Sequence, residues 1–139
     1  MTKVLRGGVI GAGVFGGYHA RQYAQAEGAG LAAVFDPDLE RAREVAARHG
    51  AAAFDDLDAF LSSVDVVTVA SPGVRHAEGA LAALRAGRSV YVEKPLAVDL
   101  EEADRILAEA SRRRLVVACG HQERVVFRRS ASSARRSVL

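Results

Sequence analysis

Residues 4–16 read VLRGGVIGAGVFG, and the order of apolar residues and glycines in this stretch decides the fold. The apolar run Val4–Ile10 has the length and composition of a buried strand, and a helical pattern covers Tyr18–Glu27. Between them lie three glycines in the spacing GxGxxG: Gly11, Gly13 and Gly16. The stretch therefore predicts a strand, a tight glycine turn and a helix.

Each glycine of the turn has a separate physical role. Gly11 permits the tight turn out of the strand, Gly13 lets the backbone approach a pyrophosphate, and Gly16 lets the helix pack closely against the sheet. The backbone amides at the start of the helix, including those of Val14 and Phe15, would then face the phosphates. We expect these five residues to bind a dinucleotide, although a glycine-rich surface turn would show the same spacing.

Asp36 is the second element of this expected site. It follows a buried strand, Leu31–Phe35, and lies 20 residues after Gly16, near the offset at which an acid binds the adenosine ribose. Its carboxylate can accept hydrogen bonds from a free 2′-hydroxyl but repels a 2′-phosphate, so NAD is the expected cofactor and NADP is less favoured. No arginine follows directly, although Arg41 in the next helix could reach. The alternative is a turn or helix-capping acid before Pro37.

The remainder of the chain alternates short apolar strands with helical segments. The expected helices are Leu39–His49, Asp56–Ser62, Arg75–Ala86 and Leu100–Arg114, and the further strands are Ala51–Phe54, Val64–Ala70, Val90–Glu93 and Leu115–Cys119. Parallel strands need crossover connections of this kind, and such crossovers are right-handed. We therefore predict an α/β fold with a single three-layer domain, a doubly wound parallel sheet of the Rossmann type in the order 3-2-1-4-5-6.

Two polar loops lie at the ends of later strands. Ser71–His76 follows the fourth expected strand, and Glu93–Pro95 closes the fifth. Ligands bind at the carboxyl ends of the strands in doubly wound folds, so both loops are expected on the rim that carries the glycine turn.

At these loops the sequence resembles the glucose-fructose oxidoreductase and inositol dehydrogenase family, also called Gfo/Idh/MocA. The resemblance covers roughly residues 4–126 and rests on four stretches: GVIGAGVFGGYHA (8–20), FDPD (35–38), SPGVRH (71–76) and AGRSVYVEKPLAVDLEEA (86–103). The glycine motif is shared by many dehydrogenases. The EKP tripeptide after an SP-x-x-x-H turn is fairly specific.

The resemblance implies a catalytic role for Lys94, which would bind the substrate oxygen undergoing oxidation and share in proton transfer, and a cis peptide bond at Pro95. A surface lysine in a turn is the alternative. By the same resemblance Ser71, Pro72, His76, Glu93 and Lys94 would lie along the cofactor. His76 is equally well explained as a structural histidine in the first turn of a helix. His121 and Gln122 are further candidates near the nicotinamide.

The resemblance also implies a second domain, which in this family binds the sugar or polyol, and which we expect this chain to lack. Residues 127–139 instead form a basic arginine and serine tail with no periodicity, which we expect to be disordered. The expected function is thus the NAD-binding domain, residues 1–126, of an oxidoreductase acting on a CH–OH group, without turnover by itself. A stand-alone NAD-binding module or regulatory subunit that pairs with another chain is the alternative, and a methyltransferase-like nucleotide site is a remote third.

Composition limits the remaining function classes. Residues 121–139 hold five arginines and one acid, so their net charge is +4. Because the net charge of the whole chain is +2, residues 1–120 carry a net charge of −2, which gives no support to nucleic-acid binding. The single cysteine, Cys119, excludes an intramolecular disulfide and a cysteine-based zinc cluster, and we expect no metal. No apolar run is long enough for a membrane span or signal peptide, so we expect a cytoplasmic protein; a homo-oligomer remains open.

Overall fold

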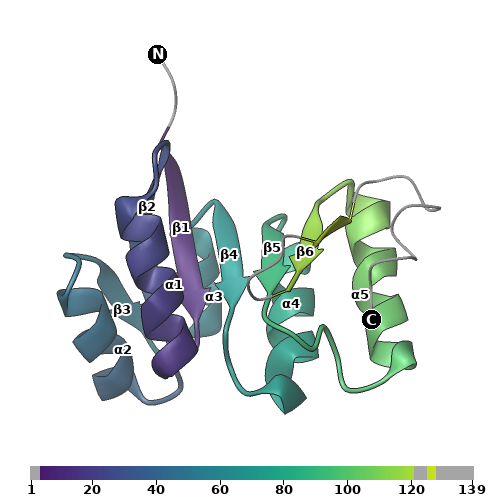
Figure 1. Cartoon of the computed structure of the whole chain (residues 1–139), viewed down its shortest axis with the longest axis horizontal. Coiled ribbons are helices and arrows are strands. Elements are labelled where there is room, and N and C mark those ends of the chain that lie inside the picture. Colours follow the sequence, from purple (N-terminus) through teal and green to yellow (C-terminus); the bar gives the residue numbers. More distant parts are fainter. Residues whose placement is uncertain (1–3, 121–124, 128–139) are drawn as a thin grey trace. The chain divides into compact units, whose positions relative to one another are not determined.

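The computed structural model describes residues 4–120 and the backbone of residues 125–127. The chain divides into two compact units, Met1–Ser71 and Pro72–Leu139, which are treated separately below (Figure 1). Within the described residues, no helix combines the length and apolar character needed to cross a membrane.

The first unit is a four-stranded parallel sheet with its crossover helices. Its elements are β1 (Leu5–Ile10), α1 (Val14–Gln25), β2 (Ala29–Phe35), α2 (Leu39–Ala47), β3 (Ala52–Phe54), α3 (Leu57–Ser62) and β4 (Val66–Val69). Within this unit the strands lie in the order β3-β2-β1-β4, and each neighbouring pair is parallel. The predicted strand and helix alternation is therefore present. Helix α1 begins at Val14, four residues before the predicted start, because the helix follows directly on the glycine turn.

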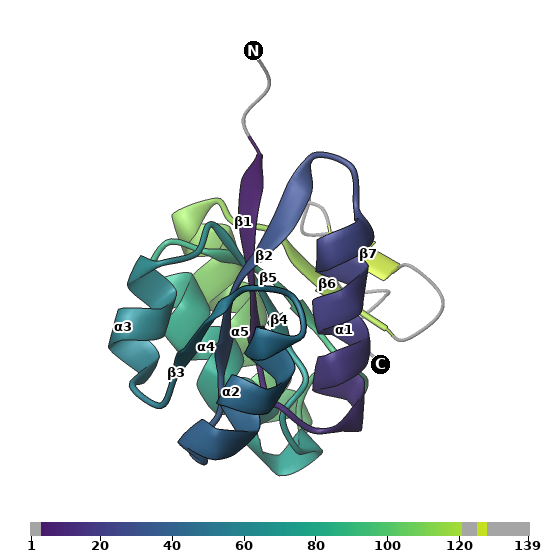
Figure 2. The same cartoon turned by 90° about the vertical axis from the view of Figure 1, so that its left-hand side faces the viewer.

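Two adjacent glycines in β1 let helices pack on both faces of the sheet. A side chain at Gly7 would overlap the ring of Tyr23 in α1, and one at Gly8 would lie 2.6 Å from Phe60 in α3. Successive residues of a strand face opposite sides, so α1 and α3 cover opposite faces, as Figure 2 shows. Between α1, α2 and the sheet, a core of small and β-branched residues is buried: Val9, Ala12, Ala20, Val34, Ala42, Val45 and Ala46.

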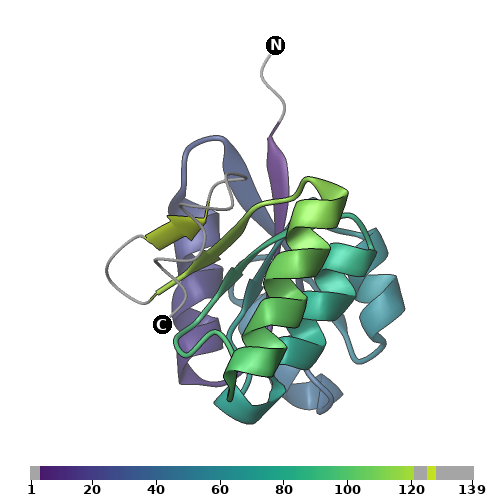
Figure 3. The ribbon, with the colours of Figure 1, turned by 90° about the vertical axis from the view of Figure 1, so that its right-hand side faces the viewer.

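The second unit contains two parallel strands, a third antiparallel strand and two long helices. Its elements are a 3₁₀ turn η1 (Gly73–Arg75), α4 (His76–Arg85), β5 (Ser89–Val92), α5 (Leu100–Arg113), β6 (Val117–Cys119) and β7 (Val125–Phe127). Strand β5 is parallel to β6, and β7 is antiparallel to β6. Helices α4 and α5 lie side by side (Figure 3).

Strand β7 was not predicted from the sequence. It pairs Phe127, the first residue of the expected tail, with Val117 of β6. Residues 128–139 lie outside the described part of the chain, so the disorder of the tail stays a prediction.

The hydroxyls of Tyr23 and Thr68 lie 2.9 Å apart and join α1 to β4 inside the first unit. Burial raises the pKa of Tyr23, which therefore stays a neutral phenol, able to donate, at all ordinary pH values. We expect Tyr23→Phe to lower the free energy of unfolding by about 1 kcal/mol, because Thr68 loses its buried partner. Urea denaturation measures the change. Tyr18→Phe, at an exposed tyrosine of the same helix, is the control and should have little effect.

Candidate functional site

The glycine turn between β1 and α1 is shaped by close backbone contacts. Gly11 has a φ of 105°, and a side chain there would lie 2.7 Å from the backbone nitrogen of Ser71. A side chain at Gly16 would overlap the carbonyl oxygen of Gly11. The turn therefore accepts only glycine at these two positions, as the motif predicts, and it brings Ser71 next to Gly11 within the first unit.

The N-terminus of α1 differs from those of three other helices. Helices α2, α3 and α5 each begin at an aspartate whose carboxylate accepts backbone hydrogen bonds: Asp38, Asp56 and Asp99. The residue before α1 is Gly13, which has no side chain to cap the helix, and the first turn of α1 contains no acid. Its first backbone N–H groups are thus left available for an anion, and the positive end of the helix dipole favours one there. Val14 and Phe15 in this turn are 88% and 63% exposed, so a ligand can reach them.

Asp36 fastens the glycine turn to the end of β2. One carboxylate oxygen accepts a hydrogen bond from the backbone N–H of Ala12 at 2.9 Å, and the other accepts one from Asp38 at 2.9 Å. The residue is only 8% exposed. The cap of α2 is Asp38, so Asp36 does not cap the helix, but its bond from the N–H of Asp38 makes it a turn acid, as the alternative interpretation predicts. Its bond from Ala12 also ties this turn to the glycine turn, and its contact with a ribose stays a prediction.

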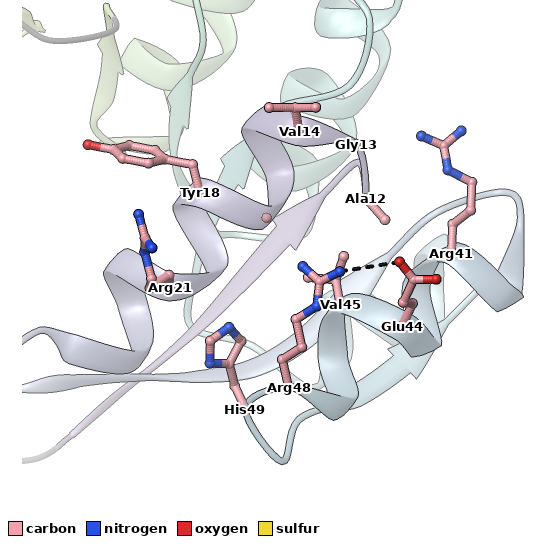
Figure 4. A pocket seen from close by; sticks show the side chains of 11 residues that line it. Ala12, Gly13, Val14, Tyr18, Arg21, Arg41, Glu44, Val45, Arg48 and His49 are labelled. Carbon is pink, nitrogen blue, oxygen red and sulfur yellow. Dashed lines mark hydrogen bonds and ion pairs between the residues drawn. The ribbon is translucent and has the colours of Figure 1, made fainter.

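A cavity of about 770 Å³ opens beside the glycine turn, between α1 and α2 (Figure 4). Two of the residues that line it, Gly13 and Gly17, have no side chains. A Cβ atom at Gly13 would lie 3.4 Å from Nη2 of Arg41, and one at Gly17 would lie 3.8 Å from Nη1 of Arg48. Arg21 of α1 and His49 after α2 also line it. The sequence analysis did not single out Arg21, Arg48 or His49; the four-residue spacing of Gly13 and Gly17 on one helix face is the signal that could have found them.

In the second unit the two predicted loops meet at Pro95. The Nδ1 atom of His76 lies 2.6 Å from the carbonyl oxygen of Pro95, so this nitrogen donates, because a carbonyl can only accept. His76 is 2% exposed, and a Cβ atom at Gly73 would lie 3.7 Å from the Pro95 ring. The peptide bond between Lys94 and Pro95 is cis, as the resemblance predicts.

The other candidates of the second unit differ in exposure. Glu93 is 8% exposed, whereas Lys94 and Pro72 are exposed. His76 thus holds the loop that carries Lys94, as a structural histidine would. Contacts of Pro72, His76, Glu93 and Lys94 with a cofactor stay predictions, and His121 and Gln122 lie outside the described residues.

The comparisons with known proteins match this arrangement. A family model described as an oxidoreductase family with an NAD-binding Rossmann fold, GFO_IDH_MocA, matches residues 5–121. The chain belongs to the Gfo/Idh/MocA family. As a member of it, the chain is an NAD-binding Rossmann domain, and the predicted parallel sheet in the order 3-2-1-4-5-6 with flanking helices is confirmed.

Individual relatives are similar over most of this chain. The UDP-N-acetylglucosamine 3-dehydrogenase of Acidithiobacillus ferrooxidans is 45% identical over 121 residues, which are 87% of this chain and 38% of that protein. Its solved structure superposes with a TM-score of 0.80, covering 84% of this chain and 37% of that one.

Two further relatives agree. Inositol 2-dehydrogenase 3 of Saccharopolyspora erythraea is 41% identical over 124 residues, with 86% of this chain and 37% of the relative covered. The structure of GenD2 from gentamicin A biosynthesis in complex with NAD is 35% identical, with a TM-score of 0.82, and covers 86% of this chain and 35% of that one. The chain thus spans a little over a third of the length of the relatives it matches.

The bridge made by Asp36 can be tested apart from any ligand. We expect Asp36→Ala to lower the free energy of unfolding by about 2–3 kcal/mol, because the N–H groups of Ala12 and Asp38 both lose a charged acceptor. Asp56→Ala is the matched control: Asp56 also accepts from two N–H groups, of Asp58 and Ala59, but is exposed, so its loss should cost about 1 kcal/mol. Equal losses for the two variants in urea denaturation would contradict the bridging role.

The thiol of Cys119 reports on the second unit. Burial raises its pKa, and the charge of Glu93 raises it further while that of Lys94 lowers it. Because the thiolate is the reacting form, the folded protein at pH 8 should react with Ellman's reagent much more slowly than the protein in urea, and faster as the pH rises. The measurement is the absorbance of the released thionitrobenzoate, with glutathione as the free-thiol control. Reaction at the rate of the unfolded protein would show that Cys119 is not buried.

Proposed function

We propose that this chain is the cofactor domain of an NAD-dependent oxidoreductase that oxidises a CH–OH group of a sugar, polyol or related substrate. The observation that carries the proposal is the structure at the start of α1. The helix has no side-chain cap, the turn before it tolerates only glycine at two positions, and the buried carboxylate of Asp36 holds that turn in place. The residues fit a dinucleotide, because the backbone of Gly13 and Val14 is open to a pyrophosphate, whereas aspartates fill the caps of α2, α3 and α5.

Asp36 supports NAD as the preferred dinucleotide. Its carboxylate is negatively charged and held at the end of β2 by two N–H groups, where the adenosine ribose binds in this fold. A carboxylate has more lone pairs than these two bonds use, so it can still accept from ribose hydroxyls. A 2′-phosphate at the same place would be repelled by it.

Lys94 is the proposed catalytic residue. It lies on a loop that is fixed by the bond between His76 and Pro95, and its ammonium group is exposed. When bound, the nicotinamide supplies the acceptor for the hydride. Lys94 would orient the substrate oxygen by a hydrogen bond, and as a neutral amine it would accept the hydroxyl proton as the hydride leaves the carbon.

Turnover by this chain alone should be very slow or absent. Lys94 is exposed to water, and a hydride transfer site requires that water be excluded and the substrate held in place. The relatives named for UDP-N-acetylglucosamine and inositol are more than twice as long as the stretch matched here. We therefore assign binding of the substrate, a cyclic sugar or polyol, to structure beyond the cofactor domain.

The sequence-based expectations of a cytoplasmic location and of a homo-oligomer stay predictions. So does the alternative of a regulatory subunit, in which a separate chain completes the site.

Titration with NADH tests the proposal. Fluorescence of bound NADH should rise and saturate below millimolar concentration. Asp36→Ala should weaken NADH binding roughly tenfold or more, through the loosened glycine turn and the lost ribose contact, whereas Lys94→Ala should change it less than about threefold. Asp56→Ala, which removes a similar pair of backbone bonds away from the turn, should leave the affinity unchanged. No response to NADH from protein shown to be folded by circular dichroism would refute the proposed function.

A further inference from the structure

The cavity between α1 and α2 continues well beyond the glycine turn (Figure 4). One end lies at Gly13 and Arg41, and the other, the distal end, is lined by Arg21, Arg48 and His49. Arg21 follows Gly13 by eight residues along α1, which corresponds to a rise of about 12 Å. The distal end is therefore separate from the backbone groups that would face a pyrophosphate.

The cations at the distal end are incompletely matched by acids. Among the residues that the structure describes, neither the guanidinium group of Arg21 nor the imidazole ring of His49 has a hydrogen bond or an ion pair. Arg48 pairs with Glu44 at 3.2 Å, but both side chains are more than half exposed, so this pair is weak. Of the described residues that line the cavity, three are arginines and only Glu44 is an acid. The cavity therefore carries an excess of positive charge.

Stabilisation of a helix end explains only part of this cluster. Arg48 and His49 follow the last residue of α2, where the helix dipole favours cations. Arg21 lies inside α1, whose last turn contains no basic residue, so it has no such role. The Nη1 atom of Arg48 also lies over α1, 3.8 Å from the place that a Cβ atom on Gly17 would take. Side chains from two elements thus meet in one cavity, which the helix ends by themselves do not require.

We propose that the distal end binds the phosphate group of a small phosphorylated molecule, at a site separate from the dinucleotide site. The planar guanidinium groups of Arg21 and Arg48 bind a phosphate through paired charged hydrogen bonds, and an N–H group of His49 adds a further donor. The cavity volume of about 770 Å³ suits a small ligand. A long polyanion is disfavoured, because residues 1–120 carry a net charge of −2.

The test is a titration of the ¹⁵N-labelled 139-residue protein with inorganic phosphate or ribose 5-phosphate at constant ionic strength, followed by two-dimensional NMR. The amide signals of Gly17, Arg21 and His49 should shift and saturate at millimolar concentration. The shifts at Arg21 and His49 should persist with saturating NADH, and the affinity should change less than about threefold, because anions about 12 Å apart are well screened at physiological ionic strength. Displacement of either probe by NADH would place it in the dinucleotide site and overturn the inference.

Variants of the lining residues test the proposed contacts. Arg21→Ala should weaken the binding of ribose 5-phosphate roughly fivefold or more and leave the affinity for NADH unchanged. Glu44→Gln should tighten it about two- to threefold, since this change releases Arg48 and removes the acid from the cavity. Glu40→Gln is the matched control: it opens the similar exposed pair with Arg43, which does not line this cavity, and should have no effect.

Three results would overturn the inference: no saturable shift at the distal end, an Arg21→Ala variant that binds ribose 5-phosphate like wild type, or equal tightening by Glu40→Gln and Glu44→Gln, which would reflect net charge alone. Failure to bind NADH, with the phosphate shifts at Arg21 and His49 intact, would instead refute the proposed function and leave this inference standing.

Discussion

The hydrogen bond from the N–H of Ala12 to the carboxylate of Asp36 is the interaction on which the first unit's site depends. It ties the turn after β1 to the loop after β2, two segments that the parallel pairing of the strands already brings to one edge. A second bond, from the Gly11 N–H to the carbonyl oxygen of Phe35 at 2.8 Å, also fixes the turn to β2. The same carboxylate that fastens the turn is the group that a ribose would meet.

The second unit fixes its candidate residue in a different way. There the buried imidazole of His76, at the start of α4, bonds the carbonyl oxygen of Pro95 in the loop after β5, and the next two residues, Leu96 and Ala97, are buried. Lys94, which is exposed, is consequently carried by a loop that is anchored directly after it. In each unit, a buried polar side chain that is distant in sequence holds a loop at the end of a strand: Asp36 holds the glycine turn and His76 holds the loop at Pro95. The exposed atoms of these two loops are accessible to ligands.

The sequence predicted the parts of this site that depend on local backbone geometry. The need for glycine at positions 11 and 16 was predicted, because their spacing reflects contacts that any side chain would break, while their contact with a dinucleotide stays a prediction. The alternation of strands and helices followed from hydrophobic patterning. The start of α1 was placed too late, since Gly16 and Gly17 have low helix propensity and the packing that overrides it is tertiary. Strand β7 was missed because three residues between charged neighbours carry no periodic signal. The second hydrogen bond of Asp36 and the approach of Arg41 to Gly13 could not be predicted, since they depend on how two loops meet in space.

The bare start of α1 also links folding to ligand concentration. A glycine at this position forgoes a stabilisation of roughly a few tenths of a kcal/mol up to about 1 kcal/mol that an aspartate would provide, as it does in α2 and α5. A bound anion returns that stabilisation, because it occupies the folded helix end and has no counterpart in the unfolded chain. The melting temperature of the protein should therefore rise with the concentration of dinucleotide. At low dinucleotide concentration a larger fraction of the protein would be unfolded and open to proteases.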